Sequence, residues 1–199
     1  NEMSNVTVTV NFSALEKEFL SSKSRAIFKR NLLPAIEKKI AEAQRQLVED
    51  FESHVVTQEI QGGENSSNIS GTLNGRGNLY GFIGFPAGSS PLTPIRNLLA
   101  KKPNIIMRQK AGLSFVIETD VPTLDKIEAE TPMPWIEGQS WVDRIEKGIS
   151  GLSHFFPKVT PSSRSGAGIQ VKNKLNEETY SQISYMSKII SDFYNKIVE

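Results

Sequence analysis

The sequence predicts an α+β fold, in which a long helix of the N-terminal half packs on a small antiparallel sheet containing a β-hairpin, with further helices toward the C-terminus. Three observations predict it. Apolar residues recur at steps of three and four from Ile36 to Val55, which indicates one buried helical face. Two β-favouring runs flank Ala111-Gly112, and a second helical period runs from Ile183 to Ile197.

The first residues predict a strand followed by a short helix. Val6 to Phe12 alternate apolar and polar residues with β-branched side chains. Ser13 with Glu16 forms a capping box for a helix through Leu20. Residues 1–22 thus form an N-terminal arm, which either extends the sheet of a neighbouring molecule or completes the core of its own subunit.

The long helix is expected from Arg25 to about His54. Pro34 lacks the N–H that an interior helical position needs, so the helix should kink or restart there. His54 lies at the C-terminal end, where the helix dipole favours the protonated ring, and we expect a structural role for it. After it, Val55 to Ile60 favour β-structure and lead into a surface loop over residues 62–68.

The middle of the chain combines a glycine-rich segment with a hairpin. Between Asn68 and Phe85, five glycines interrupt apolar and aromatic residues. A short helix is expected over Ile95 to Leu99. The hairpin should pair residues 105–110 with residues 113–119 through a two-residue turn at Ala111-Gly112, and its charged residues leave at least one face open to water or a polar partner.

The C-terminal half is expected to be irregular between Pro122 and Pro134 and helical from about Ser140 to Phe155. A connector over residues 162–168 precedes a C-terminal helix within residues 173–199. That helix either pairs with another molecule or closes the subunit's own core. No composition shift divides the chain, so we expect residues 1–199 to form a single domain.

Composition excludes much chemistry. The chain has no cysteine, only two histidines and a net charge of +1, which removes thiolate sites and any global field for polyanions. Phosphate-loop, dinucleotide and nucleophile-elbow motifs are absent. No apolar run reaches the length of a membrane span, and no signal pattern opens the sequence. We therefore expect no enzymatic activity, no catalytic, metal-binding or cofactor-binding residues, no cofactor and no membrane contact.

Two alternatives stay open. Local basic clusters would suit a nucleic-acid-binding accessory protein; among them are Lys23, Arg25, Lys29 and Arg30 on the first part of the long helix, then Lys101-Lys102, and then Arg164. A metal-dependent nuclease that would use Mg²⁺ is loosely matched by four neighbouring carboxylates with Lys126 between them: Glu118, Asp120, Glu128 and Glu130. Of these, Glu118 or Asp120 would be needed for activity.

Several phrases of the sequence resemble a known family. They are residues 54–60 after the long helix, 67–71, 77–85, 141–151 and 163–170. Together they resemble the neck or tail-completion proteins (head-to-tail connectors) of tailed bacteriophages. The resemblance implies a ring of identical subunits that joins the head-closure or portal assembly to the tail tube or tail terminator, with DNA passing through the lumen. It also implies a place in the virion after assembly in the host cytoplasm.

In such a ring the glycine-rich segment would contact a neighbouring subunit or the tail, although Phe82 and Phe85 could instead pack in their own core. The hairpin would project from the core or join a sheet shared between subunits. The candidate interaction residues are therefore Arg76, Asn78, Tyr80, Phe82, Phe85, Arg108, Lys110 and Arg164.

Overall fold

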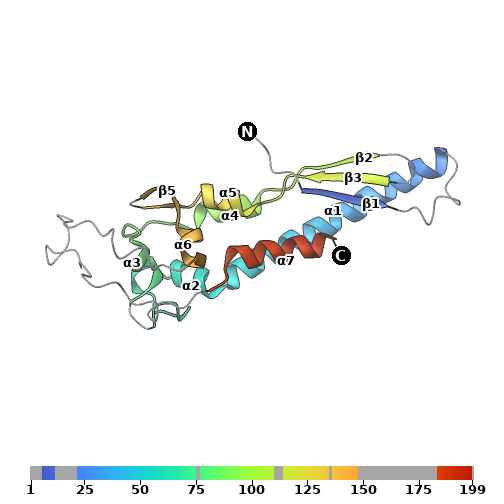
Figure 1. Ribbon diagram of the computed structural model, residues 1–199. Coiled ribbons are helices and arrows are strands. Elements are labelled where there is room, and N and C mark those ends of the chain that lie inside the picture. Colours follow the sequence, from blue (N-terminus) through green and yellow to red (C-terminus); the bar gives the residue numbers. More distant parts are fainter. Residues whose placement is uncertain are drawn as a thin grey trace.

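The α+β prediction is confirmed by the computed structural model, which describes residues 6–11, 22–74, 77–109, 114–134, 136–147 and 183–198. The molecule is elongated along helix α1, Ser22–Ser53 (Figure 1). Its 32 residues span about 48 Å at 1.5 Å per residue. Helix α1 is continuous through Pro34, so the expected restart does not occur.

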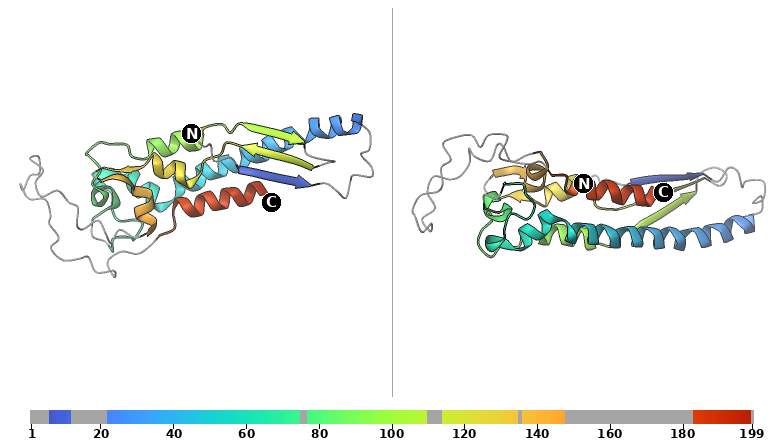
Figure 2. Two further views of the ribbon diagram at one scale, coloured as in Figure 1. Left: turned by 45° about the horizontal axis from the view of Figure 1, so that its top comes forward. Right: turned by 90° about the horizontal axis from the view of Figure 1, so that it is seen from below.

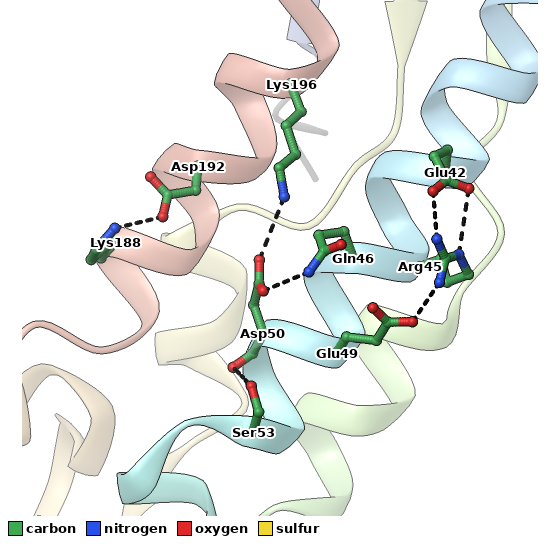
Figure 3. Close-up of polar contacts among 9 residues, drawn as sticks. All are labelled: Glu42, Arg45, Gln46, Glu49, Asp50, Ser53, Lys188, Asp192 and Lys196. Atoms are coloured by element: carbon green, nitrogen blue, oxygen red, sulfur yellow. Dashed lines mark hydrogen bonds and ion pairs between the residues drawn. The ribbon is translucent and has the colours of Figure 1, made fainter.

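The core forms where the second half of α1 meets the C-terminal helix α7, Met186–Val198. The periodic residues of both helices are buried between them: Ile40, Ala43, Leu47 and Phe51 from α1, and Ile189, Ile190, Phe193 and Ile197 from α7. Polar side chains lie outside this apolar contact on both helices, where Lys196 Nζ of α7 lies 3.7 Å from Asp50 Oδ2 of α1 (Figure 3). The C-terminal helix thus closes its own subunit's core. The predicted helix begins later than expected, since Ile183 to Tyr185 are not helical and residues 173–182 lie outside the described part.

Short helices complete this core: α2, Val55–Gln61; α3, Leu79–Ile83; α4, Thr93–Ala100; α5, Leu124–Ala129; and α6, Trp141–Lys147. A 3-10 turn, η2, covers Gly63–Asn65. Helix α4 confirms the expected short helix, and α6 confirms the start of the expected helix at Ser140; its continuation to Phe155 lies outside the described residues. None of the described helices has both the length and the apolar character needed to cross a bilayer.

Two segments differ from the prediction. Residues 55–60 are helical rather than extended, because the His54 side chain caps α2 and burial of Val56 and Ile60 outweighs their β propensity. Between Pro122 and Pro134 the chain is also regular. Thr123 caps α5 by accepting the Lys126 N–H, and β4, Pro132–Met133, pairs with β5, Ile136–Ser140.

A three-stranded antiparallel sheet lies beside the first half of α1 (Figures 1 and 2). Its order is β1, Val6–Asn11, then β3, Ser114–Thr119, then β2, Ile105–Gln109. The N-terminal strand therefore pairs with its own subunit's sheet. The short helix predicted over residues 13–20 lies outside the described residues.

The hairpin is confirmed. Ala111 and Gly112, where the two-residue turn is expected, lie outside the described residues, but the register of the two strands differs from the one that such a turn sets. Such a turn would place Gln109 opposite Ser114, whereas the sheet pairs Gln109 with Phe115. In the observed register Arg108 and Glu118 share one face and form an ion pair of 3.2 Å. A shift of one residue would place them on opposite faces and turn the buried Ile117 over.

Phe51 tests the dependence of the fold on the helix seam. Its ring is fully buried and lies 6.3 Å from the Tyr185 ring, centroid to centroid. Phe51→Ala should lower the free energy of unfolding by about 3–5 kcal/mol because it leaves a cavity. Urea denaturation measures the change. Ile27→Ala, on the same helix at 44% exposure, should stay within about 0.5 kcal/mol of wild type, and equal losses would contradict the assigned core.

Candidate interaction site

The predicted interaction residues fall on two separate surfaces. Asn78, Tyr80, Phe82 and Phe85 lie on or beside α3, at one end of the molecule. Arg108 lies on β2, in the sheet toward the other end (Figure 1). Arg76, Lys110 and Arg164 lie outside the described residues. The structure thus does not bring the described candidates together as one site.

Around α3, the candidates serve the subunit's own fold. Tyr80 is 2% exposed, so the expectation of a surface contact through this side chain is wrong. Its hydroxyl donates to the Pro86 carbonyl at 2.5 Å and lies 2.9 Å from Ser89 Oγ. Phe82 and Phe85 are half-buried against the core, and the Phe85 ring meets Trp141 edge-on at 5.6 Å. Of the two alternatives for these phenylalanines, the structure favours packing in their own core.

Asn78 has a local role that the sequence analysis missed. Its side-chain oxygen accepts the Gly81 N–H at 2.8 Å and caps α3. Its amide group donates to the carbonyls of Glu64 and Ser66 at 3.0 and 2.9 Å. Asn78 therefore ties the start of α3 to the loop after α2, and the helix ends at Gly84, which adopts a φ of 83°.

The loop between α2 and α3 is organised by a buried carboxylate. Glu59 of α2 is fully buried, yet the described residues show no ion pair for it. It accepts backbone N–H groups from Ser70 at 2.8 Å and Leu79 at 2.7 Å, and the Asn68 side chain at 3.0 Å. Asn68 in turn accepts the Leu73 N–H at 3.0 Å. Donors from three parts of the loop thus stabilise the charge that burial would otherwise penalise.

The loop still presents part of its surface. At this end of the molecule, Ile69 of the loop is 49% exposed, and Val55, the first residue of α2, is 38% exposed. A polar cleft of about 390 Å³ opens nearby between η2 and the start of α4. Arg96 lines it, but its guanidinium is engaged by Glu52 at 2.7 Å.

The junction of α1, α2 and α7 depends on His54. Its Nδ1 accepts the Val56 N–H at 3.2 Å, and its Nε2 lies 3.1 Å from the Ser184 carbonyl, so the partners assign a neutral ring that donates from Nε2. Burial lowers the pKa of His54, although Ser184 and Glu146 favour the charged form. The expected preference for a protonated ring at a helix C-terminus is therefore wrong, because His54 starts the next helix.

Side chains next to His54 hold the start of α7. The buried Tyr185 hydroxyl lies 2.8 Å from Thr57 Oγ1. Glu146 of α6 accepts the backbone N–H groups of Tyr185 and Ser187 at 3.2 and 2.7 Å, which satisfies donors at the start of α7.

The carboxylates that suggested a nuclease are engaged elsewhere. Asp120 accepts from Lys126 at 2.7 Å and from Lys101 at 3.2 Å, and these lysines lower the pKa of Asp120. Glu118 pairs with Arg108. Glu130 is exposed, and burial raises the pKa of Glu128. Within the described ranges, no three His, Asp or Glu side chains are grouped so as to hold a metal ion.

No family model, no curated protein and no solved structure matches this chain. Any functional argument therefore rests on its own residues.

Glu59 can be tested by a substitution that keeps its size. Glu59→Gln removes the charge and turns an NH₂ group toward backbone donors, so a buried donor is left unpaired. We expect the free energy of unfolding to fall by about 1–3 kcal/mol and hydrogen exchange to accelerate at Ser70 and Leu79. Glu64→Gln, at an exposed position of the same loop, is the control. Unchanged exchange in Glu59→Gln would contradict the assigned role.

His54 should make stability depend on pH. Its pKa is lower in the folded chain than its usual value of about 6.5, so the unfolded chain binds the proton more tightly. Its contribution to stability is present above about pH 6.5 and is lost as the pH falls through the folded pKa. His54→Asn keeps a capping oxygen but cannot titrate. Chemical denaturation from pH 7.5 to 5.5 should give a flatter profile for His54→Asn than for wild type; parallel profiles would exclude this role.

Proposed function

We propose that this chain is a structural protein of the bacteriophage neck, acting as a tail-completion protein. Identical subunits form a ring that joins the head-closure or portal assembly to the tail tube or terminator, and DNA passes through the lumen. The protein has no catalytic activity and belongs to the virion. The family resemblance of the sequence phrases supports this proposal, together with the shape and surface of the subunit.

The observation that carries the proposal is an extension beyond the core. Helix α7 has 13 residues, about 20 Å, and lies beside the second half of α1, with Lys196 near its end sharing a groove with Ala35 and Lys38 (Figure 2). The first half continues past the C-terminal end of α7 beside the three-stranded sheet (Figure 2). Leu32, Leu33 and Ile36 are only half-buried there, and Ile27 and Ile106 are exposed at 44% and 42%.

Such an extension suits an assembly subunit. A helical stretch of this length is marginal in water without packing on its apolar side. The half-buried residues leave apolar area that a second molecule can cover, and each fully buried side chain of this kind contributes about 1.5–3 kcal/mol. A ring component gains this contact on assembly, whereas a monomeric enzyme has no use for it.

A nucleic-acid-binding accessory protein is the second candidate, and one observation favours it. The first half of α1 holds six basic residues and one acidic residue within residues 22–39. A nuclease is less favoured, since lysines already occupy the Asp120 carboxylate that would bind Mg²⁺.

The proposal predicts where assembly stops without this protein. In the phage that encodes it, disruption of its gene should leave filled heads and finished tails that do not join. Expression of the wild-type chain from a plasmid should restore joined particles, as seen by negative-stain microscopy. Antibody labelling should mark the neck of intact virions. Joined, infectious particles that lack the chain would overturn the proposal.

A further inference from the structure

Charge is segregated along the elongated subunit. Residues 22–39 of α1 carry a net charge of +5, although the whole chain carries +1. The remaining residues therefore carry −4. We call residues 22–39 the basic half of α1; its charged residues are Lys23, Arg25, Lys29, Arg30, Lys38 and Lys39, with Glu37 the one acid.

Within the described residues, part of the basic half of α1 is exposed. Arg30, Lys38 and Lys39 are exposed, and no ion pair joins them to an acid among the described residues. Beside Lys38 and Lys39, a shallow groove of about 530 Å³ lies next to Lys196, near the end of α7. Ala35 and Ala43 contribute apolar walls to it. The surface therefore offers both positive charge and apolar area.

A complementary surface lies on the other half of the molecule. Asp125, Glu128, Glu130 and Glu137 lie on α5, just after it, and on β5, and we call them the acidic face. Asp125 and Glu128 line a cleft of about 430 Å³ together with Asp143 and Lys147. The nearby lysines are directed to other acids, Lys126 to Asp120 and Lys147 to Asp143. Asp125, Glu130 and Glu137 form no ion pair among the described residues. Burial, followed by the neighbouring carboxylates, raises the pKa of Glu128, while Lys147 in the same cleft acts in the opposite direction.

The two surfaces cannot meet within one molecule. Helix α5 and strand β5 lie over the second half of α1, and the basic half points away from them along the long axis in every view (Figures 1 and 2). A helix continuous through Pro34 cannot fold back on itself. Contact between the two surfaces therefore requires two copies of the chain.

We propose that the basic half of α1 docks on the acidic face of a second copy of this chain, and that this head-to-tail contact is the subunit interface of the proposed ring. The inference rests on the proposed function and identifies the two surfaces through which copies of the chain contact each other. Two different patches of each copy are used, so each docked copy leaves a free patch for the next, as a closed ring or a filament requires. A second copy is favoured over DNA because the chain itself carries the matching acidic face and because Ile27, on the basic half, is exposed and apolar.

Charge reversal with complementation tests the contact in the full-length chain. The basic-half variant is Lys38→Glu with Lys39→Glu, and the acidic-face variant is Asp125→Lys with Glu130→Lys; all four positions are exposed. Mass photometry and sedimentation should show wild-type oligomers that dissociate as salt increases. Each variant alone should lose oligomers. An equimolar mixture should regain them, because each variant's altered patch matches the altered patch of the other.

The control is Lys102→Glu, an exposed lysine between α4 and β2, compared with the single change Lys39→Glu. Lys102→Glu should keep wild-type oligomers, and circular dichroism should show that every variant is folded. Three results overturn the inference: a wild-type chain that stays monomeric at low salt, variants that assemble alone, or a mixture that does not recover. Loss of duplex DNA binding by the basic-half variant, with oligomers unchanged, would assign the surface to nucleic acid instead. The gene disruption tests the neck proposal separately, because a failure of heads and tails to join does not depend on which surfaces connect the copies.

Discussion

The seam between α1 and α7 is the contact around which the rest of the subunit is arranged. Four apolar positions of α1, from Ile40 to Phe51, face the apolar stripe of a helix less than half as long. Where α7 covers α1, the shorter helices find an apolar surface on which to pack, and they build one continuous core. Where α7 ends, the core ends too, and a small sheet takes its place. The unequal length of two helices therefore divides the molecule into a body and an extension.

Polar groups fix the body at the places where the chain changes direction. Helix α2 follows α1 directly because the His54 side chain caps α2. The same ring also contacts the Ser184 carbonyl, in the segment that leads into α7. Five residues after His54, the Glu59 carboxylate accepts hydrogen bonds from the loop that leads to α3. Hydrogen bonds rather than ion pairs hold both side chains: the His54 ring is neutral, and the Glu59 carboxylate accepts from backbone N–H groups. Such contacts define one geometry, since their donors must point at a single acceptor.

The sequence predicted the elements whose signal is periodic and long, and missed those that depend on contacts distant in the chain. The period from Ile36 to Val55 identified α1, and the alternation around Ala111-Gly112 identified the hairpin. The register of the hairpin did not follow from the turn, because the Arg108–Glu118 pair and the burial of Ile117 decide it. Helix α2 was read as extended because Val and Ile favour strands, and only its cap and its burial explain the helix.

The candidate interaction site shows the same difference between features that the sequence predicts and features that depend on contacts between distant residues. Tyr80 resembled a surface aromatic because glycines surround it, yet its hydroxyl finds acceptors only in the turn at Pro86 to Ser89, which sequence cannot place. Glu59 carried no sequence signal, since a lone acid between β-favouring residues reads as solvent-exposed. The charge of α1, in contrast, was visible in the sequence as a local basic cluster.

Knowledge of the fold changes the meaning of that cluster. On a helix whose length is fully covered, six basic residues would be an ordinary solvated face. On the first half of α1, Arg30, Lys38 and Lys39 are exposed, close to half-buried apolar residues of the same helix, and Lys38 and Lys39 line a groove with Lys196 of α7. The basic half of α1 and the acidic face of α5 and β5 do not neutralise each other within one molecule, because the interaction between exposed charges decays over about 8–10 Å in physiological salt. In the proposed head-to-tail contact the two surfaces meet between molecules, and the helix that organises the subunit would then set the direction in which copies join.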